Sequence, residues 1–404
     1  MVEVWFIDQF LKAKLIIIEI MLYLRRRKVI VVGFIIFFVL VYMGVFTHLF
    51  ERDFYTEFEY PLEGDVSVYV QEMRDGHKPS HEPINEYNFP FIHDCKFKCS
   101  NEITPLRVVY LVKSALKHFN NRLAIRNSWG FEKRFSDVPI RTVFVLGADN
   151  SDEKLQAKIN EESKKFGDIV QANFTDAYFN NTIKTMIAFK WAVTFCNNSK
   201  FYFFVDDDFY VSTRNVLQFL RNPVHYPAYL ETPIDSIDSK SGKTNTRDIL
   251  NKPYDNPQSA TMKTRKLSQV MDFELPEKVK LFTGYVFVSS PHRHRSGTWY
   301  VSLDEYPFHL WPPYVTAGAY VVSKEVLLDL YYGSLFTKHF RFDDIFVGLV
   351  AYKLHIEPLH CDEFYFYKKE YSVHNYHYVV ASHGYNDPNE LLKVWNEQRS
   401  IGNA

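Results

Sequence analysis

The sequence has no excess of basic residues. Its 47 lysines and arginines are balanced by 48 aspartates and glutamates, which leaves a formal net charge of -1. Proteins that bind nucleic acids usually present a strongly basic surface. The charge balance therefore argues against nucleic acid as a partner.

Glycine and cysteine are also scarce. The 404 residues include 15 glycines, and none of them forms the glycine-rich loop with which P-loop and dinucleotide-binding proteins hold phosphates. The four cysteines are Cys95, Cys99, Cys196 and Cys361. An oxidising compartment would allow disulfides among them in three pairings, whereas a metal site would need a second close pair of soft ligands. A phosphate or metal site must therefore use other side chains.

One long stretch near the N-terminus lacks charged residues. Residues 29–50 contain no aspartate, glutamate, lysine or arginine, and as a helix they would be about 33 Å long against a hydrocarbon core of roughly 30 Å. A cleaved signal peptide would have a shorter apolar centre nearer residue 1. We therefore expect a transmembrane signal-anchor at 29–50, and an interfacial helix in the shorter apolar run at 15–24.

The charges around this stretch predict its orientation. Basic residues precede it at 25–28, and an acid-rich segment follows it. Because positive charge stays in the cytosol, residues 1–28 form a cytosolic tail and the rest of the chain is lumenal or extracellular. Three glycosylation sequons agree with this topology, and their acceptor residues are Asn173, Asn180 and Asn197.

The chain after the anchor divides into an irregular stem, residues 51–103, and a main domain, residues 104–404. From residue 106 onward, short apolar strands alternate with amphipathic helices, and the helix after "VLGADN" has Ser151 as its expected N-cap. This alternation predicts a parallel sheet with helices on its faces. A polar stretch at about 222–279 has little periodicity and is expected to form an exposed, disordered loop.

Three consecutive aspartates, Asp206 to Asp208, follow the apolar strand "FYFFV". Ligands of such sheets bind beyond the carboxyl ends of the strands. Neighbouring carboxylates repel each other unless solvent or a cation screens them. The pattern is typical of a divalent metal that binds a nucleotide diphosphate through one or two carboxylates, although solvated acids are an equally good explanation of the run by itself.

A second acidic pair, Asp343 and Asp344, begins the last apolar helix of the main domain. Acids at a helix N-terminus interact favourably with the helix dipole, and spacing alone favours that capping role. The alternative is a general base that removes a proton from an acceptor hydroxyl.

Seven segments in order resemble the β1,3-glycosyltransferase family, which includes β1,3-galactosyltransferases, β1,3-N-acetylglucosaminyltransferases and, more distantly, the Fringe enzymes. The similarity spans about residues 106–395 and rests on RLAIRNSWG, FVLG, FGDIVQANFTDAYFNNTIKT, FVDDDFYV, WPPYVTAGAYVVS, DDIFVG and HGYNDPNELLKVW. It implies an α/β catalytic domain of the GT-A type, with a central, mostly parallel sheet flanked by helices.

The resemblance also implies roles for individual residues. Asp206 and Asp207 would bind the nucleotide, Asp206 and Asp208 would bind the metal with His383, and Asp344 would be the catalytic base. His374 and His377 are alternatives to His383. Arg122, Arg126 and Lys184 are further candidates for the donor phosphates, although structural ion pairs explain the two arginines equally well.

The function that the resemblance implies is transfer of galactose from UDP-galactose to the 3-hydroxyl of an acceptor glycan, with Mn²⁺ and inversion, by a type II protein of the Golgi membrane. Transfer of N-acetylglucosamine or N-acetylgalactosamine is the alternative. A non-catalytic relative that acts as a chaperone or lectin-like binder is a third hypothesis. The acceptor class and the oligomeric state stay open, and Asp343-Asp344-Ile345 in place of the family's Glu-Asp-Val is closer to the Fringe pattern.

Overall fold

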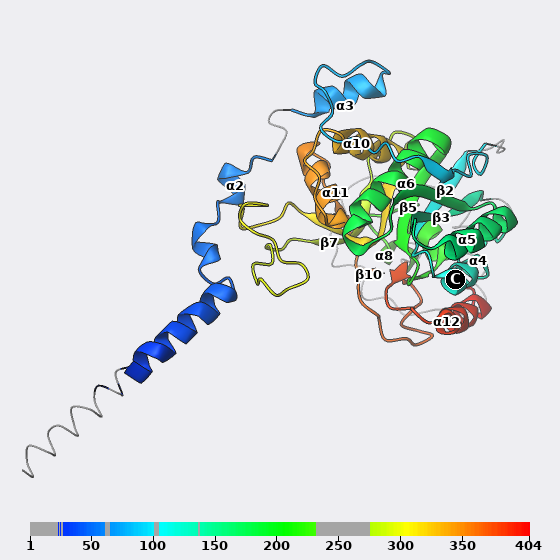
Figure 1. Cartoon of the computed structure of the whole chain (residues 1–404). Coiled ribbons are helices and arrows are strands. Elements are labelled where there is room, and N and C mark those ends of the chain that lie inside the picture. Colours follow the sequence, from blue (N-terminus) through cyan, green and yellow to red (C-terminus); the bar gives the residue numbers. More distant parts are fainter. Residues whose placement is uncertain are drawn as a thin grey trace, which may run out of the picture. The chain divides into compact units, whose positions relative to one another are not determined.

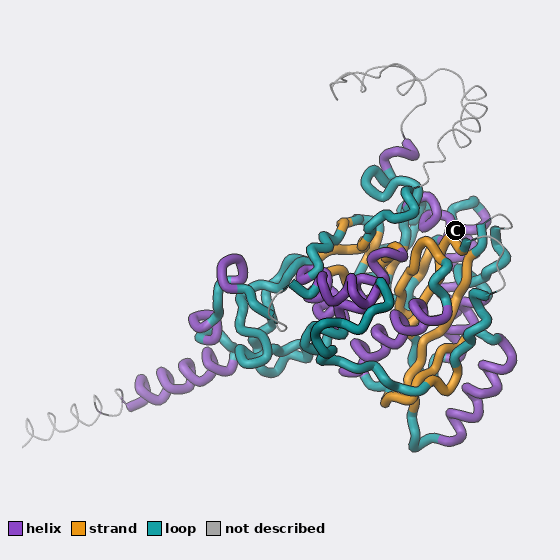
Figure 2. Tube along the Cα trace, turned by 90° about the horizontal axis from the view of Figure 1, so that it is seen from above, coloured by secondary structure: helices purple, strands orange, loops and turns teal. Residues whose placement is uncertain are grey.

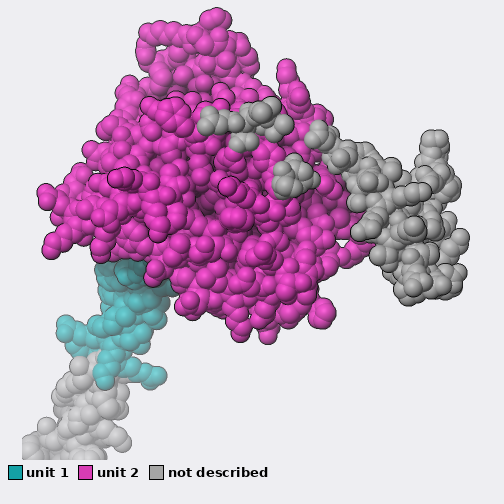
Figure 3. Space-filling view, turned by 90° about the vertical axis from the view of Figure 1, so that its right-hand side faces the viewer, with its two compact units in different colours: residues 1–59, 288–311 teal, residues 60–287, 312–404 magenta. Residues whose placement is uncertain are grey.

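The computed structural model describes residues 23, 25, 27–60, 65–100, 105–135, 138–231 and 275–404. Two compact units are coloured separately in Figure 3: residues 1–59 with 288–311, and residues 60–287 with 312–404. The predicted interfacial helix at 15–24 lies almost wholly outside the described residues, and so does most of the predicted loop at 222–279.

The smaller unit contains the segment that we predicted to be a membrane anchor. A helix runs through residues 27–42, turns follow at 43–46, and a short 3-10 helix, η1, occupies Thr47–Phe50. The predicted helix therefore ends earlier than expected. In the part of the chain that the structure describes, no helix combines the length and apolar character needed to cross a bilayer.

Elsewhere in this unit, helix α2 (Phe54–Glu57) is capped by Asp53, which accepts from the Thr56 amide at 2.9 Å. The buried Arg293 pairs with Glu51 at 2.7 Å. Its guanidinium also donates to four backbone carbonyls, those of Val301, Ser302, Tyr306 and Phe308. Arg293 thereby ties the 288–311 segment to the chain that follows η1.

The larger unit is built on an eight-stranded sheet with the order β1-β4-β3-β2-β5-β8-β7-β9. Its central strands are mutually parallel: β4 (Ile169–Thr175), β3 (Ile140–Ala148), β2 (Leu106–Lys113) and β5 (Ser199–Asp206). Antiparallel pairs flank them through β1 (Phe91–His93), β8 (Tyr314–Ser323) and β7 (Phe282–Phe287), and β9 (Leu359–His360) adds a parallel edge. A second sheet has the order β10-β11-β6 and contains β10 (Phe364–Tyr365), β11 (Ala381–Ser382) and β6 (Tyr210–Val211).

Helices cover both faces of the large sheet, as Figures 1 and 2 show. One group packs together on one face: α6 (Asn181–Phe195), α10 (Lys324–Ser334) and α11 (Asp343–Lys353). The other group comprises α4 (Phe119–Arg126), α5 (Glu153–Phe166), α7 (Thr213–Phe219) and α12 (Pro388–Ser400). Shorter helices are α3 (Ser67–Arg74), which packs on α10, α8 (Ala228–Glu231) and the 3-10 helix η2 (Tyr178–Asn180).

The central strands are apolar on both sides because each face carries helices. Phe204 of β5 stacks on Phe189 of α6 on one face, with ring centroids 4.4 Å apart. Its neighbour Phe203 points the other way and contacts Tyr110 of β2, which in turn packs edge-on against Trp129. The run "FYFFV" is therefore buried on both faces, as the alternation of strands and helices predicted.

Two predictions about local structure were wrong. The segment at 51–103, which we predicted to be irregular, contains α3 and also β1, which pairs with β4 of the larger unit. The N-cap of α5 is Asp152 and not Ser151: the Asp152 carboxylate accepts from the Leu155 amide at 2.9 Å, while the Ser151 hydroxyl donates to Asp149 at 2.6 Å. Both residue types cap helices well, so sequence alone placed the start one residue early.

The structure selects one disulfide, Cys99–Cys196, which joins the segment after β1 to the end of α6, and leaves Cys95 and Cys361 as thiols. Its cysteines are 97 residues apart. We predict that the Cys99→Ala/Cys196→Ala double variant loses about 4 to 5 kcal/mol of unfolding free energy, because a cross-link over a long loop restricts the unfolded chain. Urea unfolding measures the loss. A non-reduced digest in which Cys95 or Cys361 is cross-linked would contradict the assignment.

Candidate active site

The three aspartates lie at the carboxyl end of β5, beside the carboxyl end of the adjacent parallel strand β2. In the register of β2 with β5, Lys113 is the partner of Asp206, so the last residues of both strands are side by side. Asp207 continues this alignment, since its amide donates to the Lys113 carbonyl at 3.1 Å. The acids therefore lie at the sheet edge where the sequence predicted a ligand site.

Lys113 joins the two acidic motifs. Its buried ammonium lies 3.1 Å from an Asp206 oxygen and donates to Asp343 at 2.8 Å. The Thr185 hydroxyl of α6 donates to the same Asp343 oxygen, also at 2.8 Å. The end of β2, the end of β5, the start of α11 and α6 thus meet at one buried cation.

The contacts among Lys113, Asp206 and Asp343 shift the pKa values of all three side chains. Burial opposes the charge of Lys113, but the nearby Asp206 and Asp343 outweigh it and raise the lysine pKa. Burial also raises the pKa of Asp206, to about 7, although 38% of the side-chain surface is exposed; Lys113 opposes this shift, and Asp208 and Asp343 add to it. Asp343 differs, because the charge and hydrogen bond of Lys113 outweigh burial and hold its pKa below the usual value.

Asp207 has a supporting position. The Ser114 hydroxyl donates to it at 2.5 Å, and His118 contacts the same carboxylate at 2.9 Å. Arg122 donates to Ser114 at 3.0 Å, so a short chain of polar groups runs from α4 to Asp207. The hydrogen bond to Asp207 raises the pKa of His118. Because Asp207 is buried and its carboxylate is hydrogen-bonded to Ser114 and His118, it holds the three-aspartate segment in place and does not point toward a ligand.

Asp208 and His383 form a pair that fits a metal ion. His383 Nε2 lies 3.0 Å from one Asp208 oxygen, and this hydrogen bond raises the histidine pKa. The other Asp208 oxygen is buried and has no hydrogen-bond partner in the described structure. A carboxylate and an imidazole are suitable ligands for a divalent cation whose remaining ligands come from phosphate and water. Among the described residues, however, no group of three His, Cys, Asp or Glu side chains is arranged to hold a metal, since Asp206 pairs with Lys113.

Two glycines explain how β8 and α11 approach this edge so closely. A Cβ on Gly318 of β8 would lie 2.6 Å from the Phe209 ring and 3.7 Å from an Asp206 oxygen. A Cβ on Gly348 of α11 would lie 2.6 Å from Cβ of Tyr314 in β8. Larger residues would push α11 away from the strand. The glycines of "TAGAY" and "DDIFVG" therefore help to hold the first turn of α11 beside the aspartates.

The two acids of that turn have different surroundings. Asp343 is buried in the Lys113 network, whereas Asp344 is partly exposed and accepts from the amide of the next residue, Ile345, at 2.8 Å. Neither is the N-cap, which is Phe342. Burial, with the charge of Asp343, raises the pKa of Asp344 to about 7. A carboxylate with that pKa can accept a proton near neutral pH.

The cationic candidates for the donor phosphates are engaged elsewhere. Arg122 is completely buried and pairs with Glu162 at 2.6 Å, and Arg126 pairs with both Glu162 and Asp168. These are the structural ion pairs that the sequence left open as the alternative. Lys184 lies nearer the site, because it donates to the Ser114 carbonyl at 2.9 Å, but its charge is paired with Asp176 at 2.7 Å.

The remaining predicted residues lie on the surface or on another element. Asn173 and Asn197 are exposed, whereas Asn180 is half-buried and its amide donates to the Thr175 carbonyl at 2.8 Å. His377, an alternative to His383, accepts at Nδ1 from the side-chain amide of Asn403 at 3.0 Å. No contact of His374 with the aspartates appears in the described structure, so the geometry favours His383.

Sequence reasoning missed Lys113, His118 and Thr185. Lys113 had a signal, since it is the charged residue that ends the apolar run "LRVVYLV" in the same way that Asp206 ends "FYFFV". The positions of His118 and Thr185 depend on how α4 and α6 pack, which no local pattern reveals.

We predict that Lys113→Met destabilises the fold by about 3 to 5 kcal/mol at neutral pH, because the buried Asp343 and the partly buried Asp206 lose their shared cation. Asp343→Asn should destabilise it as well, since Lys113 then keeps Asp206 alone. The double variant should lose less unfolding free energy than the two single variants lose together. Urea unfolding of the three variants measures this coupling, and strictly additive losses would show that Lys113 and Asp343 do not depend on each other.

Comparisons with known proteins identify the family of this chain. The sequence model of the family described as "Galactosyltransferase" matches residues 120–258 and 259–362. The chain is 39% identical over 365 residues to "Beta-1,3-galactosyltransferase brn" of Drosophila melanogaster, covering 90% of this chain and 93% of that protein. It is 30% identical over 318 residues to "Beta-1,3-galactosyltransferase 1" of Homo sapiens, covering 79% of this chain and 81% of that protein. It is 27% identical over 355 residues to human "Beta-1,3-galactosyltransferase 2", covering 86% of this chain and 70% of that protein. The chain therefore belongs to the galactosyltransferase family, a family of hexosyltransferases.

Proposed function

We propose that this protein is an inverting, metal-dependent β1,3-galactosyltransferase that moves galactose from UDP-galactose to the 3-hydroxyl of an acceptor glycan. One observation carries the proposal: Lys113 joins Asp206 to Asp343, and each of these residues is close in sequence to a functional candidate, Asp208 with its partner His383 on one side and Asp344, whose pKa is raised, on the other. The names of the relatives support galactose as the sugar.

In the proposed reaction, Asp344 takes the proton of the acceptor 3-hydroxyl while that oxygen attacks the anomeric carbon of galactose. The bond from this carbon to the phosphate oxygen breaks on the opposite face, and UDP leaves with the electron pair. Configuration at the anomeric carbon inverts because attack and departure are in line. Asp343 stays ionised beside Lys113 and raises the proton affinity of Asp344 through its negative charge.

Asp208 and His383 are the residues that would hold Mn²⁺ in this proposal. The unpartnered Asp208 oxygen supports the assignment, because a buried carboxylate oxygen without a donor is costly. When bound, a divalent ion offsets negative charge on a departing diphosphate. Asp206 would contribute once donor binding loosens its pairing with Lys113, as the nucleotide-binding acid that the resemblance implies.

Aromatic side chains beside the site could receive the acceptor sugar. Tyr314, whose backbone Gly348 of α11 approaches closely, stacks on Phe287 at 5.7 Å. Phe287 contacts Phe366, which also meets Tyr285 at 4.7 Å and is 40% exposed. Sugar rings pack well on partly exposed aromatic rings, so we propose that this cluster binds the acceptor.

Two alternatives differ in substrate or in class. Transfer of N-acetylglucosamine or N-acetylgalactosamine would use the same base and metal and differ in the sugar pocket alone. A chaperone or lectin-like relative would need neither a base nor a metal. The presence of Asp344 with a raised pKa, together with the Asp208–His383 pair, favours an enzyme.

We further propose that residues 29–50 anchor the protein in the Golgi membrane as a type II protein with a lumenal catalytic domain. The uncharged sequence supports this, as does the exposure of its apolar side chains: 65% for Val29, 60% for Phe34 and 65% for Phe38. A row of exposed apolar side chains needs an apolar environment.

We predict that Asp344→Asn lowers galactose transfer by roughly two to four orders of magnitude, because an amide cannot accept the proton. Donor binding should change little, so kcat falls at saturating UDP-galactose. The matched control is Asp387→Asn, which alters the N-cap of α12, where Asp387 accepts from the Asn389 amide. Asn caps a helix about as well as Asp, so this control should keep full activity. If Asp344→Asn keeps more than about a tenth of wild-type transfer, Asp344 is not the base.

The pH dependence of kcat tests the same residue independently. Because the ionised form of Asp344 is the active base and its pKa is about 7, kcat should rise as the pH increases through 7 and reach a plateau above it. The residual activity of Asp344→Asn should lack this step. Asp343→Asn removes a neighbouring negative charge and should move the step to lower pH, provided that the variant folds.

We predict that Asp208→Asn abolishes Mn²⁺-dependent binding of UDP while preserving the fold, since the replaced oxygen has no donor to lose. Calorimetry with UDP and Mn²⁺ measures binding, and thermal melting measures the fold. The control Asp149→Asn changes an exposed carboxylate that accepts from Ser151 and should bind normally. Unchanged affinity in Asp208→Asn would exclude this residue as a ligand.

The topology predicts protection of everything after residue 50 when sealed microsomes are treated with protease, and a glycosidase-sensitive shift of the protected band. Substitution of Asn173 or Asn197 by Gln should each reduce this shift, because both residues are exposed. Digestion of the large fragment without detergent would contradict the lumenal orientation.

A further inference from the structure

A basic cavity lies at the other edge of the sheet from the aspartates. It has a volume of about 460 Å³ and is lined by Arg126, Asn127, Phe131, Lys133, Arg134, Trp395 and Arg399. These residues come from the end of α4, the segment that leads into the start of β3, and the last turns of α12. Since β2 and β3 are parallel and the aspartates follow carboxyl ends, the amino end of β3 belongs to the opposite edge.

Among the described residues, Arg126 is the one cation of this cavity that has a carboxylate partner. Arg126 is neutralised by Glu162 and Asp168. Arg134 and Arg399 both lie over the ring of Trp395, with guanidinium carbons 5.0 and 5.4 Å from its centroid, and no ion pair of either is found among the described residues. Burial, with the positive charge of Arg399, lowers the pKa of Arg134. Like charges are thus held together without a counter-charge in the described part of the chain.

Two lining residues also carry buried donors without acceptors. Nε of Arg134 and Nε1 of Trp395 are both inaccessible to solvent and have no hydrogen-bond partner in the described structure. A buried N–H without an acceptor costs on the order of 1 to 3 kcal/mol, more for a charged group. An oxyanion would accept from such donors and would neutralise the arginines, which bind sulfate and phosphate in a planar, bidentate manner.

The size and one apolar wall of the cavity indicate what carries the oxyanion. Its volume falls within the range of small-ligand sites, roughly 300 to 1,000 Å³, and exceeds what a single inorganic ion would fill. Phe131 lines it with a side chain that is 49% exposed and is therefore open to a sugar ring. We propose that this cavity binds a sulfated or phosphorylated sugar, with the oxyanion between Arg134 and Arg399 and the sugar ring on Phe131.

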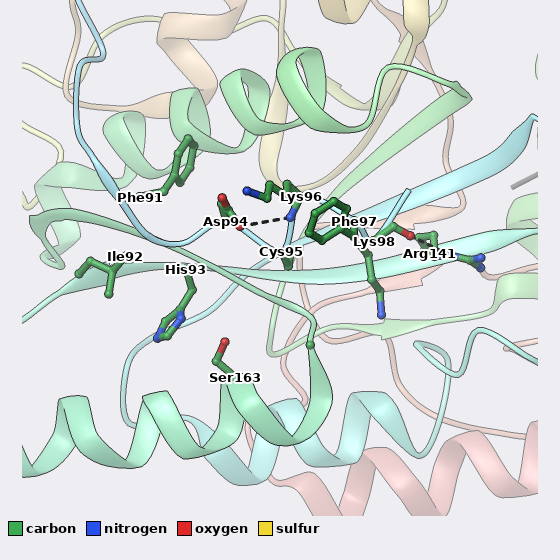
Figure 4. A pocket seen from close by; sticks show the side chains of 11 residues that line it. Phe91, Ile92, His93, Asp94, Cys95, Lys96, Phe97, Lys98, Arg141 and Ser163 are labelled. Atoms are coloured by element: carbon green, nitrogen blue, oxygen red, sulfur yellow. Dashed lines mark hydrogen bonds between the residues drawn. The ribbon is translucent and has the colours of Figure 1, made fainter. Parts of the chain in front are cut away.

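A larger cavity beside β1 differs in this respect. It has a volume of about 650 Å³ and is lined by the segment around Cys95, shown in Figure 4. Lys98 pairs there with Glu132 at 3.0 Å, Arg141 donates to the Lys98 carbonyl at 3.1 Å, and the Lys96 ammonium lies over the Phe97 ring. Asp94 adds a negative charge to its wall. An acid thus lines that cavity, whereas no aspartate or glutamate is among the described residues that line the cavity of Arg134 and Arg399.

The test measures binding of galactose 6-sulfate to the full-length protein in detergent by calorimetry, with galactose 6-phosphate, galactose and inorganic sulfate as comparison probes. We expect saturable binding with a Kd on the order of 1 mM or tighter. Arg134→Gln/Arg399→Gln should weaken it by at least about tenfold, and Trp395→Phe, which keeps a ring but lacks the N–H, by severalfold. The control Lys164→Gln removes one exposed positive charge on α5 and should bind normally.

Several outcomes would overturn the proposal. Absence of saturable binding, or equal affinity in the double variant, would exclude an oxyanion site, and inorganic sulfate binding as tightly as galactose 6-sulfate would exclude the sugar. If the arginines serve packing on Trp395 alone, the double variant will melt at lower temperature and no probe will raise the melting temperature of the wild type. Should the double variant not fold, Lys133→Gln on the exposed rim gives the same test with a smaller expected loss. Asp208→Asn should leave this binding intact, so failure here is separate from failure of the proposed transferase reaction.

Discussion

The buried ammonium of Lys113 is the interaction on which the site depends. It lies between Asp206 at the end of β5 and Asp343 at the start of α11, and both contacts are near 3 Å. Without a cation, two carboxylates at this depth would repel each other and one would take up a proton. The lysine therefore allows the strand motif and the helix motif, which are more than a hundred residues apart in sequence, to share one edge of the sheet.

The same cation separates the roles of two adjacent acids. Asp343 is held ionised by Lys113 and Thr185, so it acts as a fixed negative charge. Asp344 receives little help from the lysine, and burial together with Asp343 raises its pKa to about 7. Neighbouring carboxylates whose surroundings push their pKa values apart are a common basis of acid and base assignments in enzymes. In the proposed reaction Asp343 is thus the fixed charge and Asp344 the proton acceptor, and neither residue serves as the N-cap.

The sequence predicted the sheet, its flanking helices and the strand-end position of the aspartates, because these follow from apolar periodicity and from the general geometry of α/β sheets. It could not predict that Arg122 and Arg126 form ion pairs with Glu162 and Asp168, since those partners lie on α5 and at the start of β4. The expectation of irregular structure at 51–103 was wrong for a similar reason: the three residues of β1 are recognisable as a strand only through their pairing with β4. Tertiary contacts, and not local propensity, decide each of these cases.

The central claim is that the acids at this edge transfer galactose with inversion to a 3-hydroxyl. It is tested most directly by incubating the full-length protein with Mn²⁺, acceptor glycans and, in parallel, UDP-galactose, UDP-N-acetylglucosamine and UDP-N-acetylgalactosamine, followed by NMR analysis of the product linkage. The account predicts a product from UDP-galactose in which galactose is joined β1,3 to the acceptor. An α-linked product would contradict inversion, and transfer of an N-acetylhexosamine in place of galactose would contradict the proposed donor.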